Sequence, residues 1–114
     1  MPKIPEPKVA EPKRPASIFA ALGDETRLRL VFRLSGGGPL SITKLTEGSK
    51  LTRQAITKHL RVMETAGLVS SAQQGRQSVW QLKQRGLEDA QHYLDLISKQ
   101  WDDALGRLRD LVED

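Results

Sequence analysis

The residues best suited to chemistry lie in the segment LTRQAITKHLRVMETAG, between Leu51 and Gly67. At 3.6 residues per turn, Ile56, Leu60 and Met63 share one face of a helix, because their spacings are four and three. The opposite face carries an amide, a hydroxyl and two cations, from Gln54, Thr57, Lys58 and Arg61. A helix that docks by an apolar stripe and presents such groups suits the DNA major groove. An ordinary surface helix with a solvated basic face is the alternative.

Individual roles follow from position along this helix. Thr52 is expected to cap it, because a threonine hydroxyl accepts a hydrogen bond from an orphan backbone N–H. Residues near the helix N-terminus lie deepest in a groove, so base edges are expected to be read by Arg53, Gln54, Thr57 and Lys58. Lys50 and Arg61 are expected to hold phosphates instead.

Two short helical patterns precede this helix. Residues 16–22 form the first, and Asp24 is a suitable N-cap for a second helix over residues 26–35. We expect Leu28, Val31 and Phe32, with Leu34, to point inward, and most of the arginines at 27, 29 and 33 to be solvated. The Gly-rich residues 35–39 are expected to form a loop.

A third, brief helix over residues 42–46 begins after Ser41 and directs Ile42 and Leu45 inward. Two short helices joined by a turn, with the second basic on its outer face, form a helix-turn-helix. The period then changes to two, and residues 68–74 and 77–82 flank Gly75-Arg76 as a hairpin. Such a hairpin is a wing, with Trp80 and Leu82 packed on the helices. Its tip could reach phosphates or the minor groove through Gln74, Arg76 and Gln77; a solvated turn is the alternative.

From Gly86 onward an apolar seam steps by three or four residues for more than three heptads. One small domain has too little core to bury a seam this long, so the seam predicts a dimer interface over about residues 84–112. Apolar side chains of the first helix could pack beside it. The expected interface residues are Ile18, Phe19, Leu22, Leu87, Ala90, Leu94, Ile97, Trp101 and Leu108.

Length, composition and charge limit the classes of protein to which this sequence can belong. The 114 residues allow one domain, at 16–114, after a disordered leader at 1–15 that holds five of the six prolines. No cysteine is present, which excludes disulfides and thiolate metal sites.

Charge is distributed unevenly along the chain. Residues 1–84 carry 14 basic and 6 acidic groups, whereas residues 85–114 carry 4 basic and 8 acidic groups. The first part therefore suits a polyanion as partner, and the last 30 residues do not. With no apolar span or signal-peptide centre, we expect a soluble, cytoplasmic protein that does not engage a membrane.

Three segments together resemble the ArsR/SmtB family of bacterial winged-helix repressors. They are ALGDETRLRLV at 21–31, SITKLTEGSKLTRQAITKHLRVMETAGLV at 41–69, and QGRQSVWQL at 74–82. The resemblance implies a mainly α fold with a small two-stranded antiparallel wing, a winged helix-turn-helix that dimerises through its first and last helices. It also implies double-stranded DNA as partner, with the fourth helix in the groove, and repression relieved by an effector.

The chain departs from the family at its metal-sensing positions. The third helix has no cysteine or histidine, and the last helix has one histidine, His92, near Glu88, Asp89 and Asp95. We expect no metal and no cofactor, so a small molecule or a protein remains as a possible effector. His59 is expected to fix the central helix by a hydrogen bond. An enzyme is disfavoured because neither histidine has a catalytic partner; a winged helix used only for protein–protein contacts is the other alternative.

Overall fold

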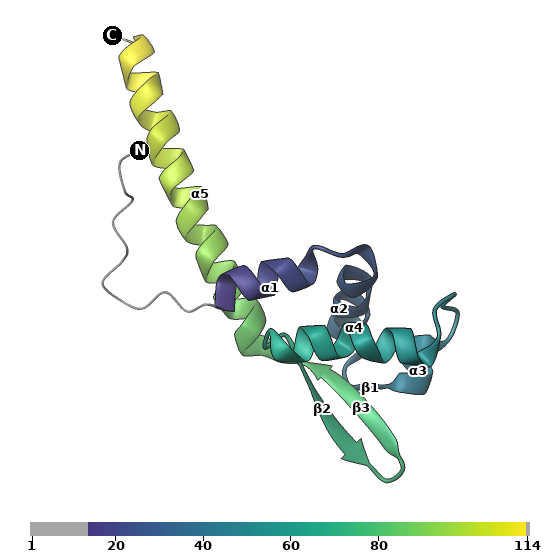
Figure 1. Cartoon of the computed structure of the whole chain (residues 1–114). Helices are drawn as coiled ribbons and strands as arrows, with labels where there is room; N and C mark the ends of the chain where they lie inside the picture. Colours follow the sequence, from purple (N-terminus) through teal and green to yellow (C-terminus); the bar gives the residue numbers. More distant parts are fainter. Residues whose placement is uncertain (1–13, 114) are drawn as a thin grey trace.

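The computed structural model describes residues 14–113. Its first four helices lie together as one group, from which a small sheet projects on one side and a long terminal helix rises on the other (Figure 1). Helix α1 (Arg14–Leu22) begins before the predicted start at Ala16 and includes Pro15. A proline is tolerated in the first turn because the N–H that it lacks would have no partner within the helix. The remainder of the predicted leader, residues 1–13, lies outside the described residues. Asp24 caps α2 (Glu25–Gly37) as predicted, with its Oδ2 accepting from the N–H of Arg27 at 3.0 Å.

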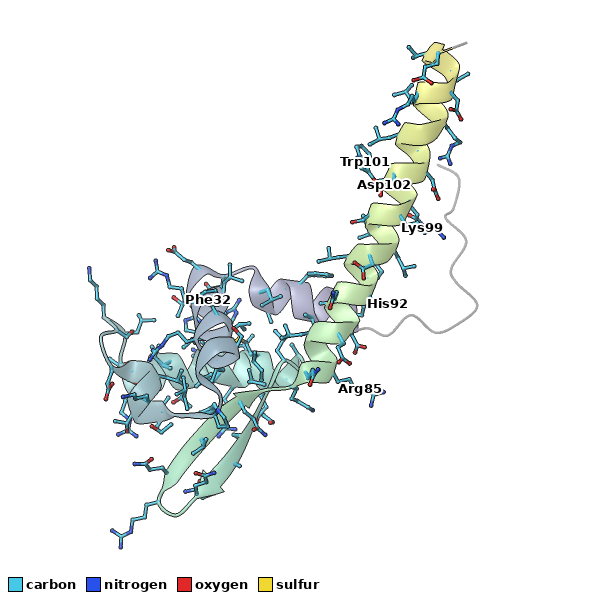
Figure 2. The ribbon with its side chains drawn as sticks, turned by 180° about the vertical axis from the view of Figure 1, so that it is seen from behind. Phe32, Arg85, His92, Lys99, Trp101 and Asp102 are labelled. Atoms are coloured by element: carbon cyan, nitrogen blue, oxygen red, sulfur yellow. The ribbon has the colours of Figure 1, made fainter. Side chains whose placement is uncertain are left out.

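The inward face of α2 was predicted only in part. Val31 and Leu34 are buried, but Leu28 and Phe32 are 54% and 79% exposed, and Leu30 takes the inward position instead. Phe32 is labelled on α2 in Figure 2. Apolar residues occupy both sides of this helix, so the spacing of apolar residues alone does not decide which side faces the core. The helix also continues through the expected loop to Gly37, and the chain leaves it at Gly38, whose φ of 70° favours glycine.

The next elements are β1 (Leu40–Ser41), α3 (Ile42–Thr46) and α4 (Arg53–Thr65). Ser41 caps α3 as predicted, with its hydroxyl accepting from the N–H of Lys44 at 3.1 Å. Ile42 and Leu45 are buried, as expected for the inward side of this short helix. The chain between α3 and α4 turns at Gly48, whose φ is 73°.

Strands β2 (Val69–Gln74) and β3 (Gln77–Leu82) form the predicted wing, and their turn contains Gly75 with φ 60°. The sheet has a third strand that was not predicted, because β1 pairs antiparallel with β3 and gives the order β1-β3-β2. A two-residue strand has no periodicity of its own, so only its pairing with the distant Trp80 identifies it. Trp80 is buried and Leu82 packs against the core, as expected.

Helix α5 (Gln84–Glu113) has 30 residues and rises away from the other elements (Figure 1). Its first turn packs closely on the chain after α4: a Cβ at Gly86 would overlap the carbonyl oxygen of Gly67. The N–H of Lys83 also donates to the carbonyl oxygen of Leu68 at 2.8 Å. The direction of α5 is therefore fixed against the end of α4.

Candidate nucleic-acid interface

Helix α4 is held by its apolar side and presents its polar side to solvent. Ile56, Leu60 and Met63 are almost completely buried, as the spacing predicts. The Thr52 hydroxyl accepts from the N–H of Ala55 at 3.1 Å, which confirms the predicted N-cap. The exposed residues of this region are Lys50, Thr52, Arg53, Gln54, Lys58 and Arg61, and Thr57 is half-buried.

An arginine of α2 fixes the short helix that precedes α4. The guanidinium of Arg33 donates to the carbonyl oxygens of Leu45 at 2.8 Å and Lys44 at 3.0 Å. These carbonyls lie at the C-terminal end of α3, where the helix dipole is negative, so the cation interacts favourably with that dipole. Arg33 therefore positions the first helix of the helix-turn-helix.

A second arginine of α2 fixes α4 itself. Arg27 donates through Nε to the carbonyl oxygen of Ala21 at 2.7 Å, and its Nη1 lies 3.3 Å from Nδ1 of His59. The predicted hydrogen-bonding role of His59 is thus confirmed. The hydrogen bond from the Arg27 N–H holds the pKa of Asp24 below its usual range, and the charge of the Arg27 guanidinium acts in the same direction. Of the three arginines of α2, Arg29 and Arg33 are exposed, as predicted for most of them, and Arg29 pairs with Glu25 on the surface. The links that Arg27 and Arg33 make to other elements were not predicted.

The wing carries its polar side chains at the end remote from the helices. Gln74, Arg76 and Gln77 are all exposed at the tip. The tip is braced within the hairpin, because the side chain of Gln73 donates to the carbonyl oxygen of Gly75 and accepts from the hydroxyl of Ser78 at 3.3 Å. These hydrogen bonds hold the backbone of the turn, and the polar side chains at the tip remain exposed.

Arg61 differs from the other predicted contacts because its guanidinium is already bonded within the chain. Its Nη1 donates to Oε1 of Glu64 at 2.8 Å, and its Cζ lies 5.2 Å from the ring centroid of Trp80. Glu64 accepts a second hydrogen bond from the hydroxyl of Ser71, on the wing. Neither Glu64 nor Ser71 was predicted as a site residue, although the spacing of Arg61 and Glu64 is that of a helical ion pair.

The predicted dimer interface divides into two groups. Leu94, Ile97, Trp101 and Leu108 are exposed along one side of α5, and Figure 2 shows Trp101 on the side of α5 opposite His92 and Lys99. These four side chains have no cover from the described part of their own chain.

The other predicted interface residues lie in or beside the hydrophobic core. Ile18 and Ala90 are 0% and 6% exposed within the core of the single chain, so their expected place in an interface is corrected to the core. They belong there because α1 packs on the start of α5. Phe19, Leu22 and Leu87 are partly buried at the edge of that core, and the ring of Phe19 lies 6.2 Å from that of Tyr93.

Metal-ligating side chains are dispersed. Within residues 14–113 no group of three histidine, aspartate or glutamate residues is placed to hold a metal ion. His92 is exposed on α5, whereas His59 lies between α4 and α2 with Arg27. In the same range no helix is long and apolar enough to cross a membrane.

Comparison with known proteins adds to this geometry. A family of helix-turn-helix domains matches residues 22–72, which run from the last residue of α1 into strand β2 of the wing. The chain is 34% identical over 101 residues to the HTH-type transcriptional regulator Rv2034 of Mycobacterium tuberculosis, covering 89% of this chain and 91% of that protein. It is also 34% identical over 62 residues to the arsenical resistance operon repressor of Escherichia coli, covering 54% of this chain and 53% of that protein.

A solved structure has a closely similar arrangement. The ArsR-like transcriptional regulator from Rhodococcus sp. RHA1 superposes with a TM-score of 0.74 at 34% identity, covering 86% of this chain and 92% of the other. The similarity therefore extends beyond the helix-turn-helix and includes most of the described elements.

Proposed function

The chain belongs to the ArsR/SmtB-type family of winged helix-turn-helix transcriptional regulators, and we propose that it is a homodimeric repressor of a palindromic operator. As a DNA-binding regulator it is not an enzyme. Its site of action would be the cytoplasm. The observation that carries the proposal is the exposed face of α4, which joins hydrogen-bonding groups to cations and has no acidic residue between Ser49 and Arg61.

In this proposal α4 lies in the major groove. Arg53, Gln54, Thr57 and Lys58 read base edges, because they occupy the first two turns of the helix. Lys50 and the wing residue Arg76 bind phosphates, and Gln74 and Gln77 follow the adjacent minor groove or backbone. Support for this division comes from position, since the tip residues lie at the far end of the hairpin from α4.

The proposed dimer rests on the exposed apolar side of α5. Leucine, isoleucine and tryptophan side chains cover several turns of this helix with no partner among the described residues. A contiguous apolar patch of this kind marks a protein interface in a soluble protein. A two-fold dimer would place two α4 helices about one DNA turn apart, roughly 34–36 Å, and so explain a palindromic site.

Selection of bound fragments from the source genome, followed by a mobility-shift titration, tests this function. We expect a small set of fragments that share an inverted repeat, and sedimentation should give a dimer at micromolar concentration. Reporter expression from a recovered promoter should fall when the protein is present. Binding of no fragment above bulk DNA would contradict the proposal, as would a monomer that binds the repeat tightly.

A further inference from the structure

The side chains of Arg61 and Glu64 connect α4 to both strands of the wing. Glu64 divides its two carboxylate oxygens, with Oε1 accepting from Arg61 at 2.8 Å and Oε2 accepting from the hydroxyl of Ser71 at 2.9 Å. Ser71 belongs to β2, and it lies directly opposite Trp80 of β3 in the antiparallel register. Because Arg61 also covers the Trp80 ring, the two helix residues together contact both strands.

The network uses the charge of Arg61 inside the chain. The hydrogen bonds from Arg61 and then from Ser71 hold the pKa of Glu64 below its usual range, so the carboxylate is ionised at neutral pH. The Arg61 side chain is largely exposed, but its guanidinium is paired with this carboxylate and lies over an aromatic ring. The pair therefore offers a phosphate much less net charge than Lys58 or Arg53 does.

We propose that Arg61 is a positioning residue, which with Glu64 and Ser71 clamps the wing to the recognition helix so that both meet DNA together. This inference rests on the proposed DNA-binding function. The clamp lies near the base of the wing, and the strand beyond Ser71 is exposed up to the tip. Ser71 lies four residues before Gly75, about 13 Å of extended chain, so a tilt of about 10° would move the tip by about 2 Å. That displacement is enough to break hydrogen bonds from the tip.

The direction in which Glu64→Gln changes DNA affinity separates the positioning role of Arg61 from phosphate binding. Glu64→Gln removes a negative charge beside the DNA face, and if Arg61 were a phosphate contact it would also free the guanidinium. Affinity would then rise and the salt dependence would steepen by about one counterion. A clamp predicts the opposite, about fivefold to tenfold weaker binding, with the slope of log affinity against log salt unchanged.

The experiment is fluorescence anisotropy at several salt concentrations, with a labelled duplex recovered from genomic selection by the wild-type protein. Ser71→Ala should weaken binding about as much as Glu64→Gln, whereas Ser71→Thr should bind like wild type because it keeps the hydroxyl. Arg61→Ala should weaken binding with the salt slope unchanged, whereas loss of a phosphate contact would lower that slope by about 0.9. Backbone relaxation of Gly75 should show greater mobility of the tip in Glu64→Gln.

The outcomes are distinguishable. Tighter binding by Glu64→Gln, a lower salt slope in Arg61→Ala, or equal weakening by Ser71→Thr and Ser71→Ala would overturn the clamp while leaving DNA binding intact. Absence of DNA binding by the wild-type protein would overturn the proposed function and this inference with it. Thermal melts of all four variants should stay near wild type, because these side chains lie at the surface and not in the core.

Discussion

Helices α4 and α5 differ in the chemistry of their apolar and polar sides. On α4 the exposed side is polar and cationic, while its apolar side is packed in the core of the domain. On the outer part of α5 nearly every residue is exposed, and the apolar side has no cover from the described part of the chain. A polar face is well solvated when no DNA is bound, whereas exposing an apolar face of this length to water is unfavourable in free energy. This difference supports the proposals that α4 binds nucleic acid and that α5 binds a second protein chain.

The largest expected effect comes from placing a charge in the apolar side of α5. Ile97→Glu should give a monomeric or poorly folded protein and weaken operator binding by at least about 100-fold, because two symmetry-related carboxylates would be buried without partners. No DNA-facing residue changes in this variant. Sedimentation and a mobility-shift titration are the measurements.

Leu96 provides the matched control, since it is 47% exposed, against 48% for Ile97, and lies outside the apolar stripe by its helical position. Leu96→Glu should remain dimeric and bind the operator. If both variants dimerise normally, α5 is not the interface.

The junction between the two helices is the next most sensitive point. A Cβ at Gly86 would overlap the backbone at Gly67, so Gly86→Ala should lower the free energy of unfolding by about 2–3 kcal/mol. Gly106, on the same helix, has nothing within 4 Å of an added Cβ. Gly106→Ala should therefore raise the stability by about 0.5–1 kcal/mol. Urea denaturation of both variants measures the contrast; equal effects would mean that α5 does not pack on the end of α4.

The sequence predicted the structure best where neighbouring residues determine a single local conformation. The cap at Thr52, the inward face of α4 and the turn at Gly75 each follow from neighbouring residues, and each was predicted correctly. The inward face of α2 was predicted only in part, because Leu28 and Phe32 lie on one side of the helix and Leu30 and Leu34 on another, with the same spacing. Pairing of β1 with β3 depends on contacts distant in sequence, which no local pattern encodes.

The candidate site shows the same division. The exposure of Arg53, Gln54 and Lys58 could be predicted, because it follows from the periodicity of one helix. The link from Arg61 through Glu64 to Ser71 could not, since it requires the wing to fold back on α4. Likewise, Ile18 and Ala90 are apolar residues on helices that were expected to form an interface, and only the packing of α1 on α5 places them in the core.

Two substitutions on the DNA side separate base reading from phosphate binding. Gln54→Ala should cost about 1–3 kcal/mol of binding at the operator and relax the preference for one base pair, while leaving bulk DNA binding unchanged. Arg76→Ala should weaken all sequences alike and lower the salt slope by about one. Mobility shifts with operator and scrambled duplexes at several salt concentrations provide the test. Unchanged operator affinity in both variants would mean that this face is misassigned.

The smallest expected effect is that of metal ions on the DNA complex. Metal sensors of the family described above use cysteines or paired histidine and carboxylate ligands, and this sequence has no cysteine and two histidines. Those histidines lie on different helices, and His59 is occupied by the hydrogen bond to Arg27. Zinc, nickel, cadmium and arsenite at moderate concentration should therefore leave the mobility shift unchanged, and His92→Ala should behave as wild type. Stoichiometric metal bound tightly at His92, with release of DNA, would refute this prediction.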